Sequence, residues 1–327
     1  MTYHQPPLAP KAAFPPARGL SSTNVSATVS DQTAATGAGR ETAWTRAARR
    51  PLLALLPITL LDLVLFLFPM GIMAVVSFLR AREFELSREL TLANYLFFLG
   101  NWIYVRVLLR TVVVAALVTG ACLVLAYPFA YFLIELPRRW QRTILVLVVM
   151  PFWTSYLLRV YAWMTILGEH GLVNQALLLG GVIREPLRFL LHSYFALIVV
   201  SVYLYLPYSV LALYTTLERL DRSLVRAALD LGARPTQAFL HVVLPLSLPG
   251  ALASFVFVFI PMLGEFVTPR LVGGAEAMLI VNILVSQMRA LRFGVGAAMT
   301  FVIAGLVLLL LLAVRRAINL ERVFGVT

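Results

Sequence analysis

The stretch RAALDLGARPTQAFLHVVLP, residues 226–245, is a polar segment between two apolar segments that are each long enough to cross a bilayer. Asp221, a residue type that caps helix N-termini, precedes a helical pattern, and Gly232 supplies a turn after it. Pro235 stands where the first residue of a second helix tolerates a missing N–H. We therefore predict a helix-turn-helix between two membrane spans, which makes the chain an all-α integral membrane protein.

The composition agrees with a membrane protein. Of the 327 residues, 61% are hydrophobic, whereas apolar residues make up roughly half of a soluble globular protein. The net charge is +12, but the basic residues are spread among apolar runs and do not form one stripe. This distribution indicates membrane topology and predicts no nucleic-acid partner.

Residue types that catalysis would need are scarce. The single cysteine, Cys122, lies within an apolar run, so the chain can form neither an internal disulfide nor a thiolate metal cluster. The sole lysine, Lys11, lies in the polar N-terminal region, which excludes a phosphate-binding loop of the form G-x-x-x-x-G-K-[ST]. The sequence also contains no G-x-S-x-G or H-E-x-x-H pattern. We therefore predict a chain with no catalytic residue, metal, cofactor or ATPase site of its own, so that if ATP drives this protein, another subunit hydrolyses it.

Hydropathy divides the chain into four regions. Residues 1–50 are predicted to be a disordered cytoplasmic tail, and residues 51–107 a first transmembrane helix with its outer loop. Residues 108–317 form the main transmembrane domain and residues 318–327 a cytoplasmic C-terminal tail. Apolar runs near the roughly 20 residues that a bilayer requires predict the spans. The predicted spans are residues 52–79, 108–134, 143–166, 193–216, 248–268 and 294–314.

Arginine placement orients these spans. With the N-terminus in the cytoplasm, the inner connections collect many arginines, and residues 217–247 are cytoplasmic, as are both termini. The long outer connections, 168–191 and 272–293, contain amphipathic pieces that predict short helices on the outer surface. Such helices would either support a soluble partner or shield the rim of the bundle.

The polar stretch carries the signature of a known family. That signature reads Glu-Ala-Ala, three residues, Gly, six residues, Phe, two residues, an aliphatic residue, one residue and Leu-Pro. The matching positions are Ala227, Ala228, Gly232, Phe239, Val242, Leu244 and Pro245, and Arg226 stands in place of the leading Glu. On these residues the chain resembles the permease subunits of binding-protein-dependent ABC importers. The resemblance implies that these positions, Arg226 included, couple the permease to an ATPase.

The resemblance also implies the architecture and the partners. The expected fold is the six-helix transmembrane domain of a type I ABC importer with a cytoplasmic coupling helix-turn-helix, in the cell inner (plasma) membrane. The expected partners are a cytoplasmic ATP-binding subunit, a second permease subunit and a periplasmic or extracellular solute-binding protein, besides membrane lipid. Residues 151–177 and 264–274 resemble the spermidine/putrescine-type permeases in particular.

The implied solute is therefore a polyamine such as spermidine or putrescine. Related permeases are associated with opines, phosphonates and other small solutes, which remain alternatives. A different class, the ion-coupled secondary transporter, would need ion-coordinating groups at mid-membrane and often an internal repeat. The sequence has neither a repeat nor an acidic cluster within its apolar runs.

Glu265 is the acid that a substrate path would use. Pro261, Gly264 and Pro269 interrupt the apolar run around it, and broken helices at membrane depth are tolerated where they line a cavity. Glu265 would contact a cationic substrate, or it would pair with a base such as Arg159 or cap the helix break.

Aromatic residues crowd the third and fourth spans. We place Trp153 and Tyr156 with Glu265 in the candidate substrate path, because they adjoin Pro151 and polar residues, and aromatic rings can hold a polyamine by cation–π contact. The alternative is that these rings belong to the membrane-interface belt or to the packing between helices.

Overall fold

The computed structural model describes residues 57, 59–82 and 85–323. The predicted tail at residues 1–50 and the last four residues, 324–327, lie outside the described residues. Contacts divide the chain into two units, residues 1–70 and 71–327. The first unit contributes most of the helical segment Thr59–Phe78, which comprises the π-helix η1 (Leu63–Leu67) and α2 (Phe68–Phe78). This segment of 20 residues is long and apolar enough to cross a membrane.

The second unit begins with an element that the sequence did not predict. A two-stranded antiparallel hairpin, β1 (Leu79–Arg82) and β2 (Glu85–Leu90), precedes α3 (Ala93–Gly100). The Asn94 side chain donates to the carbonyl oxygens of Ser77, at 2.9 Å, and Leu79, at 2.8 Å, so α3 fixes the start of the hairpin. The hairpin lies within the region predicted as an outer loop.

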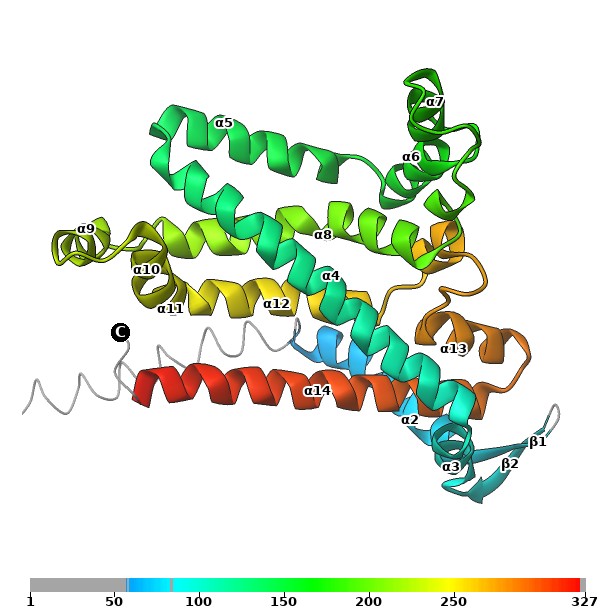
Figure 1. Ribbon diagram of the computed structural model, residues 1–327. Helices are drawn as coiled ribbons and strands as arrows, with labels where there is room; N and C mark the ends of the chain where they lie inside the picture. Colours follow the sequence, from blue (N-terminus) through cyan, green and yellow to red (C-terminus); the bar gives the residue numbers. More distant parts are fainter. Residues whose placement is uncertain (1–56, 58, 83–84, 324–327) are drawn as a thin grey trace, which may run out of the picture. The chain divides into compact units, whose positions relative to one another are not determined.

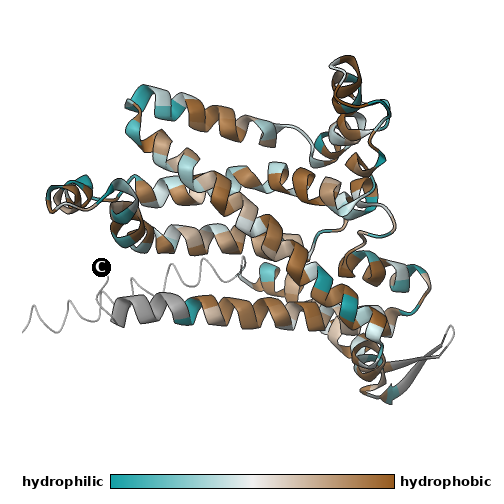
Figure 2. Ribbon diagram, viewed as in Figure 1, coloured by the Kyte–Doolittle hydropathy of each residue, from teal (hydrophilic) through white to brown (hydrophobic). Residues whose placement is uncertain are grey.

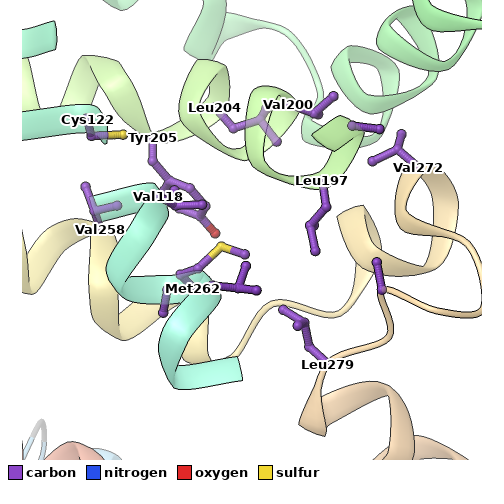
Figure 3. Packing of buried hydrophobic residues seen from close by; sticks show 14 of the residues in the cluster. Val118, Cys122, Leu197, Val200, Leu204, Tyr205, Val258, Met262, Val272 and Leu279 are labelled. Carbon is purple, nitrogen blue, oxygen red and sulfur yellow. The ribbon is translucent and has the colours of Figure 1, made fainter. Parts of the chain in front are cut away.

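Three long helices, α4 (Trp102–Glu135), α8 (Tyr194–Leu217) and α12 (Leu248–Leu263), pack against one another and form the centre of the second unit (Figure 1). The close approach of α12 to α8 requires Gly250, because a Cβ there would lie 2.5 Å from Thr216 Oγ1. Figure 3 shows the core that they enclose, with Val118 and Cys122 from α4, Leu204 and Tyr205 from α8, and Val258 and Met262 from α12.

The remaining elements connect or flank these helices. Between α4 and α8 lie α5 (Arg138–Val149), η2 (Met150–Trp153), α6 (Tyr156–Leu167), α7 (Leu172–Leu179) and η3 (Arg188–Leu190). Between α8 and α12 lie α9 (Arg222–Asp230), α10 (Pro235–Ala238), η4 (Phe239–Val243) and α11 (Leu244–Leu246). After α12 come η5 (Pro269–Gly273), α13 (Ile280–Arg289) and α14 (Phe293–Val323). The helices α7 and α13 confirm the short helices predicted in the two long connections.

Among the described residues, four helical segments are long and apolar enough to cross a membrane alone, and the number is six if each of two bent pairs forms one span. One pair, Arg138–Trp153 with Tyr156–Leu179, bends by 93°, and the other, Pro235–Leu246 with Leu248–Leu263, bends by 66°. The predicted span at 143–166 is therefore broken near Pro151, and the predicted span at 248–268 ends at Leu263 because Gly264 follows. Figure 2 shows hydrophobic residues along α4, α8, α12 and α14, and hydrophilic residues in α9 and at the start of α5.

Candidate functional site

The polar helix-turn-helix, residues 221–245, is called the elbow here. Its first helix, α9, begins where Asp221 Oδ1 accepts a hydrogen bond from the backbone N–H of Ser223 at 2.9 Å. This bond favours the carboxylate form and holds the pKa of Asp221 below its usual value. The predicted helix cap is therefore present, and it fixes the point at which the chain leaves α8.

Gly232 ends the first helix of the elbow with a left-handed turn. Its φ is +88°, its N–H donates to Leu229 O at 2.9 Å, and the next N–H, of Ala233, donates to Ala228 O at 3.0 Å. This pair of bonds is the Schellman arrangement, which satisfies the last carbonyl groups of a helix. No atom lies within 4 Å of the place that a Cβ would take, so the demand for glycine is conformational and not steric.

The second half of the elbow packs inward. The Phe239 ring meets the rings of Tyr127 and Tyr131 on α4 edge-on, with centroids 6.0 and 6.1 Å apart, and Val243 is 1% exposed. Outward side chains occur in both halves of the elbow, and among the large apolar ones Leu231, 89% exposed, at the turn is more open than Leu240, 54% exposed, in the second half. Phe239 thus anchors the elbow to the bundle.

A second contact ties the elbow to the end of α4. Arg222 Nη1 lies 3.2 Å from Glu135 Oε2, and Arg222 Nη2 donates to the carbonyl of Ile134. The sequence analysis did not predict this pair, because the two residues are 87 positions apart and the local sequence around either residue does not indicate its partner. The elbow is therefore held to α4 at both of its halves.

The residues that match the family signature are distributed over both faces of the elbow. Arg226 and Ala227 are exposed, and Ala228, Phe239, Val242, Leu244 and Pro245 are half-buried. Arg226 lines a pocket of about 110 Å³ whose other walls include Glu135, Arg222 and Val225.

The second candidate site is the break after α12. Glu265, 7% exposed, follows the helix end at Gly264, and its Oε1 accepts hydrogen bonds from the backbone N–H groups of Val267 and Thr268, both at 3.1 Å. These are the otherwise unpaired donors at the start of the helical turn that leads into η5. The carboxylate therefore caps the restarted helix, which is one of the roles that the sequence left open.

The other oxygen of Glu265 joins two further helices to the break. Tyr156 of α6 and Tyr205 of α8 donate their hydroxyls to Glu265 Oε2, at 2.8 and 2.7 Å. Because the Tyr156 proton is used in that bond, the Thr268 hydroxyl, 2.7 Å from Tyr156 Oη, donates to it. All the donors come from this chain, and together they fill the acceptor positions of the carboxylate.

Arg159 does not pair with Glu265. Its guanidinium lies 5.4 Å from the centroid of the Phe152 ring and 5.8 Å from that of Tyr156. Within the described ranges, its buried Nε has no hydrogen-bond partner. The ion-pair alternative is therefore wrong, and the Tyr156 ring separates the two charges.

Of the predicted substrate-path residues, the structure brings Tyr156 and Glu265 together and leaves Trp153 apart, with 79% of its surface exposed. Sequence reasoning did not select Tyr205. A usable signal existed, because Ser201, Tyr205 and Ser209 recur every four residues and so form one polar stripe on the otherwise apolar α8. Ser209 of this stripe accepts a hydrogen bond from Ser254 of α12 at 2.7 Å.

Comparisons with known proteins agree with this architecture. The family model for binding-protein-dependent transport system inner membrane components matches residues 113–319. The spermidine/putrescine transport system permease protein PotB of Escherichia coli (strain K12) is 38% identical over 263 residues, which cover 79% of this chain and 95% of PotB. The inner membrane ABC transporter permease protein YdcU of the same organism is 36% identical over 248 residues, covering 71% of this chain and 77% of YdcU.

A solved structure supports the fold. One chain of the bacterial alginate ABC transporter, in complex with an alginate pentasaccharide-bound periplasmic protein, superposes with a TM-score of 0.63 and 16% sequence identity. The alignment covers 80% of this chain and 92% of that one. At this identity the likeness concerns the fold alone.

Membrane-length helices, a polar elbow and a broken apolar helix are together the architecture of a membrane transport component. The chain belongs to the family of binding-protein-dependent transport system inner membrane components, and it is a permease subunit of an ABC importer for a small solute. The type I importer fold is confirmed. This family assignment excludes the alternative of an ion-coupled secondary transporter.

Proposed function

We propose that this permease forms the translocation path for a polyamine such as spermidine or putrescine. The observation that carries the proposal is the 38% identity to PotB over 79% of the chain. The test is uptake of radiolabelled spermidine and putrescine by cells that lack their own polyamine transporters and express the complete system. Uptake that requires this chain supports the proposal, and uptake of neither polyamine refutes it.

We further propose that a separate subunit hydrolyses the ATP. The sequence has no lysine beyond Lys11, so a phosphate-binding loop has no lysine to use. The elbow would face that subunit, which requires residues 217–247 and both termini to be cytoplasmic. Purified chain should hydrolyse no ATP until a subunit with such a loop is added. In this arrangement, we propose a cytoplasmic tail at residues 1–50 and a first transmembrane helix with its outer loop at 51–107. The main transmembrane domain comprises residues 108–317, and a cytoplasmic C-terminal tail comprises residues 318–327.

The remaining partners of the proposal are a second permease subunit and an external solute-binding protein. The helices α7 and α13 lie in the two long connections that are predicted to be on the outer side of the membrane. They would give the solute-binding protein a surface to contact. Stimulation of ATP hydrolysis in the complete complex by the solute-loaded binding protein would support this role. Deletion of α7 should abolish that stimulation and leave the unstimulated rate.

In the proposed path, Glu265 acts through its negative charge and through the bonds that hold the break. Four donors already occupy its oxygens, so a cationic solute can reach the carboxylate only when the hydroxyl of Tyr156 or Tyr205 turns away. Substrate contact would therefore be linked to separation of α6 or α8 from the break. Trp153 would meet the solute earlier, because it is exposed.

One observation favours a second candidate, a solute with an acidic group such as an opine or a phosphonate. Whereas Glu265 is saturated with donors, the Arg159 guanidinium has a buried Nε without a partner among the described residues. Arginine binds carboxylate and phosphonate groups through paired N–H donors. Competition of labelled spermidine uptake by opines and phosphonates separates the candidates, and Arg159→Gln should weaken uptake of an acidic solute alone.

A further inference from the structure

The first turn of α5 carries a dense positive charge. Arg138, Arg139 and Arg142 are all exposed, whereas Gln141 between them is buried and donates to the carbonyls of Ile134, at 3.2 Å, and Leu136, at 2.7 Å. At about 100° of rotation per residue, the arginines fall within an arc of about 100° that excludes Gln141. They therefore form one cationic face, called the arginine face below.

The arginine face continues along the helix as an apolar face. Val146 follows Arg142 by four residues on the same side of α5, and Met150, the first residue of η2, follows Val146 by another four; they are 57% and 53% exposed. Leu147, 58% exposed, and Trp140, 51% exposed, widen this stripe. The rise from Arg142 to Met150 is about 12 Å at 1.5 Å per residue. This is close to the thickness of one leaflet's hydrocarbon layer, about 15 Å.

Within the described part of the chain, no ion pair neutralises the charge on this face. The ion pairs between described residues are Arg188–Glu169 and Arg222–Glu135, so none involves the arginine face. Glu218, which directly follows α8, is an exposed acid near this end of α5, and its charge and those of Arg138 and Arg142 all contribute to the electrostatic field at Tyr214. The helix dipole adds positive potential at the same end of α5, so the three cations lie where a helix disfavours them. An anion from outside the chain would relieve this repulsion.

We propose that the arginine face binds the phosphate headgroup of an anionic phospholipid, whose acyl chain lies along Val146, Leu147 and Met150. The arginine side chain supplies paired donors for phosphate oxygens, and Trp140 is of the residue type that prefers the headgroup level. A cytoplasmic protein partner would explain the charge but not the exposed apolar stripe that continues for one leaflet on the same face. The lipid would brace the α4–α5 turn, which Gln141 links to Tyr214 of α8 by a 2.9 Å hydrogen bond.

The experiment measures lipid binding to the purified complex by native mass spectrometry. The complex is titrated with phosphatidylglycerol or with phosphatidylcholine of the same acyl chains, and the dissociation constant of the first bound lipid is compared. A basic residue near an anionic membrane surface contributes on the order of fivefold in affinity. The variant R138Q/R139Q/R142Q should therefore weaken phosphatidylglycerol binding about a hundredfold and leave phosphatidylcholine binding unchanged.

Two further variants make the result specific. R184Q/R289Q/R292Q removes the same charge from three exposed arginines outside this face and should bind phosphatidylglycerol like the unmodified chain. R138K/R139K/R142K retains the charge and should recover most of the affinity, which a folding defect would not allow. Equal affinity in the Gln and unmodified proteins, or an equal loss in the control, would overturn the proposal. The proposal would also be overturned if R138Q/R139Q/R142Q lost the ATP-binding subunit but bound phosphatidylglycerol normally, because the arginines would then contact a protein partner.

Discussion

Glu265→Gln tests the assignment of the helix break most directly, because it retains the size of the side chain and removes its charge. The amide oxygen can still accept from the backbone N–H groups of Val267 and Thr268, now as a neutral acceptor. The amide nitrogen, however, would face the hydroxyls of Tyr156 and Tyr205, which now donate to Oε2 at 2.8 and 2.7 Å. A donor would meet two donors, so both hydroxyls must rotate or separate from the side chain.

The expected magnitude follows from the kind of bond that is lost. A hydrogen bond to a charged group contributes about 1.5–3 kcal/mol, and a neutral one about 1 kcal/mol. Exchanging two charge-assisted bonds for neutral ones, with reoriented hydroxyls, should weaken the attachment of α6 and α8 to the break by about 1–4 kcal/mol. Tyr205→Phe removes one of these bonds and should cost about 1.5–3 kcal/mol.

The assay combines stability with transport. The apparent melting temperature of the purified complex should fall for Glu265→Gln and for Tyr205→Phe, and the double variant should fall by less than the sum because the two residues share one bond. Spermidine uptake should decrease in Glu265→Gln while assembly persists. Arg159→Gln is the control for a general loss of charge and should not reproduce the melting-temperature decrease. Unchanged melting and unchanged uptake in Glu265→Gln would refute the reasoning.

The other predictions concern the elbow. Gly232→Asp should preserve membrane insertion but uncouple uptake from ATP hydrolysis, because a φ of +88° strains any side chain with a Cβ and the new charge opposes docking; normal uptake would contradict this. Arg226→Glu should reduce co-purification of the ATP-binding subunit at low salt through like-charge repulsion, whereas equal yields at low and high salt would mean that Arg226 is only solvated. Arg222→Gln should change the free energy of unfolding by less than about 1 kcal/mol, because its ion pair with Glu135 is half-exposed. It should nevertheless lower the amount of solute taken up per ATP hydrolysed, and Glu135→Gln should have the same effect. An unchanged ratio of uptake to hydrolysis in both variants would contradict a coupling role for this contact.

The elbow could be predicted closely because its signals are local. Asp221 caps the following helix through a neighbouring N–H, and Gly232 adopts the positive φ that the turn demands. Each of these depends on residues within a few positions. The spans at 52–79, 108–134, 193–216 and 294–314 were equally accessible, since their length and apolar character lie in continuous stretches of sequence, whereas the one predicted at 143–166 is broken and the one at 248–268 ends early.

The partners of Glu265 were not accessible in the same way. Tyr156 and Tyr205 are 109 and 60 positions away, and each stands among several other aromatic residues in its span. Aromatic composition therefore selected Tyr156 together with Trp153, although only Tyr156 meets the carboxylate. The packing of α6 and α8 against the break decides between such neighbours, and single-sequence periodicity does not contain it.

The positions of these bonds suggest how movement at the elbow reaches the break. The elbow leads through α11 into α12, whose 16 residues extend about 24 Å before Gly264. Beyond that end, Glu265 is bonded to α8 through Tyr205, while Tyr214 of the same helix holds the α4–α5 turn through Gln141. A shift of α12 relative to α8 must therefore either break the Tyr205–Glu265 bond or carry α8 with it. Because the bond is charge-assisted and buried, coupled movement of α12 and α8 is favoured over slippage until a cation takes the place of the hydroxyl. In Glu265→Gln this bond is weaker, so ATP hydrolysis should continue while less of the α12 movement is transmitted to the break. The amount of solute taken up per ATP hydrolysed should therefore fall further in Glu265→Gln than in Arg159→Gln.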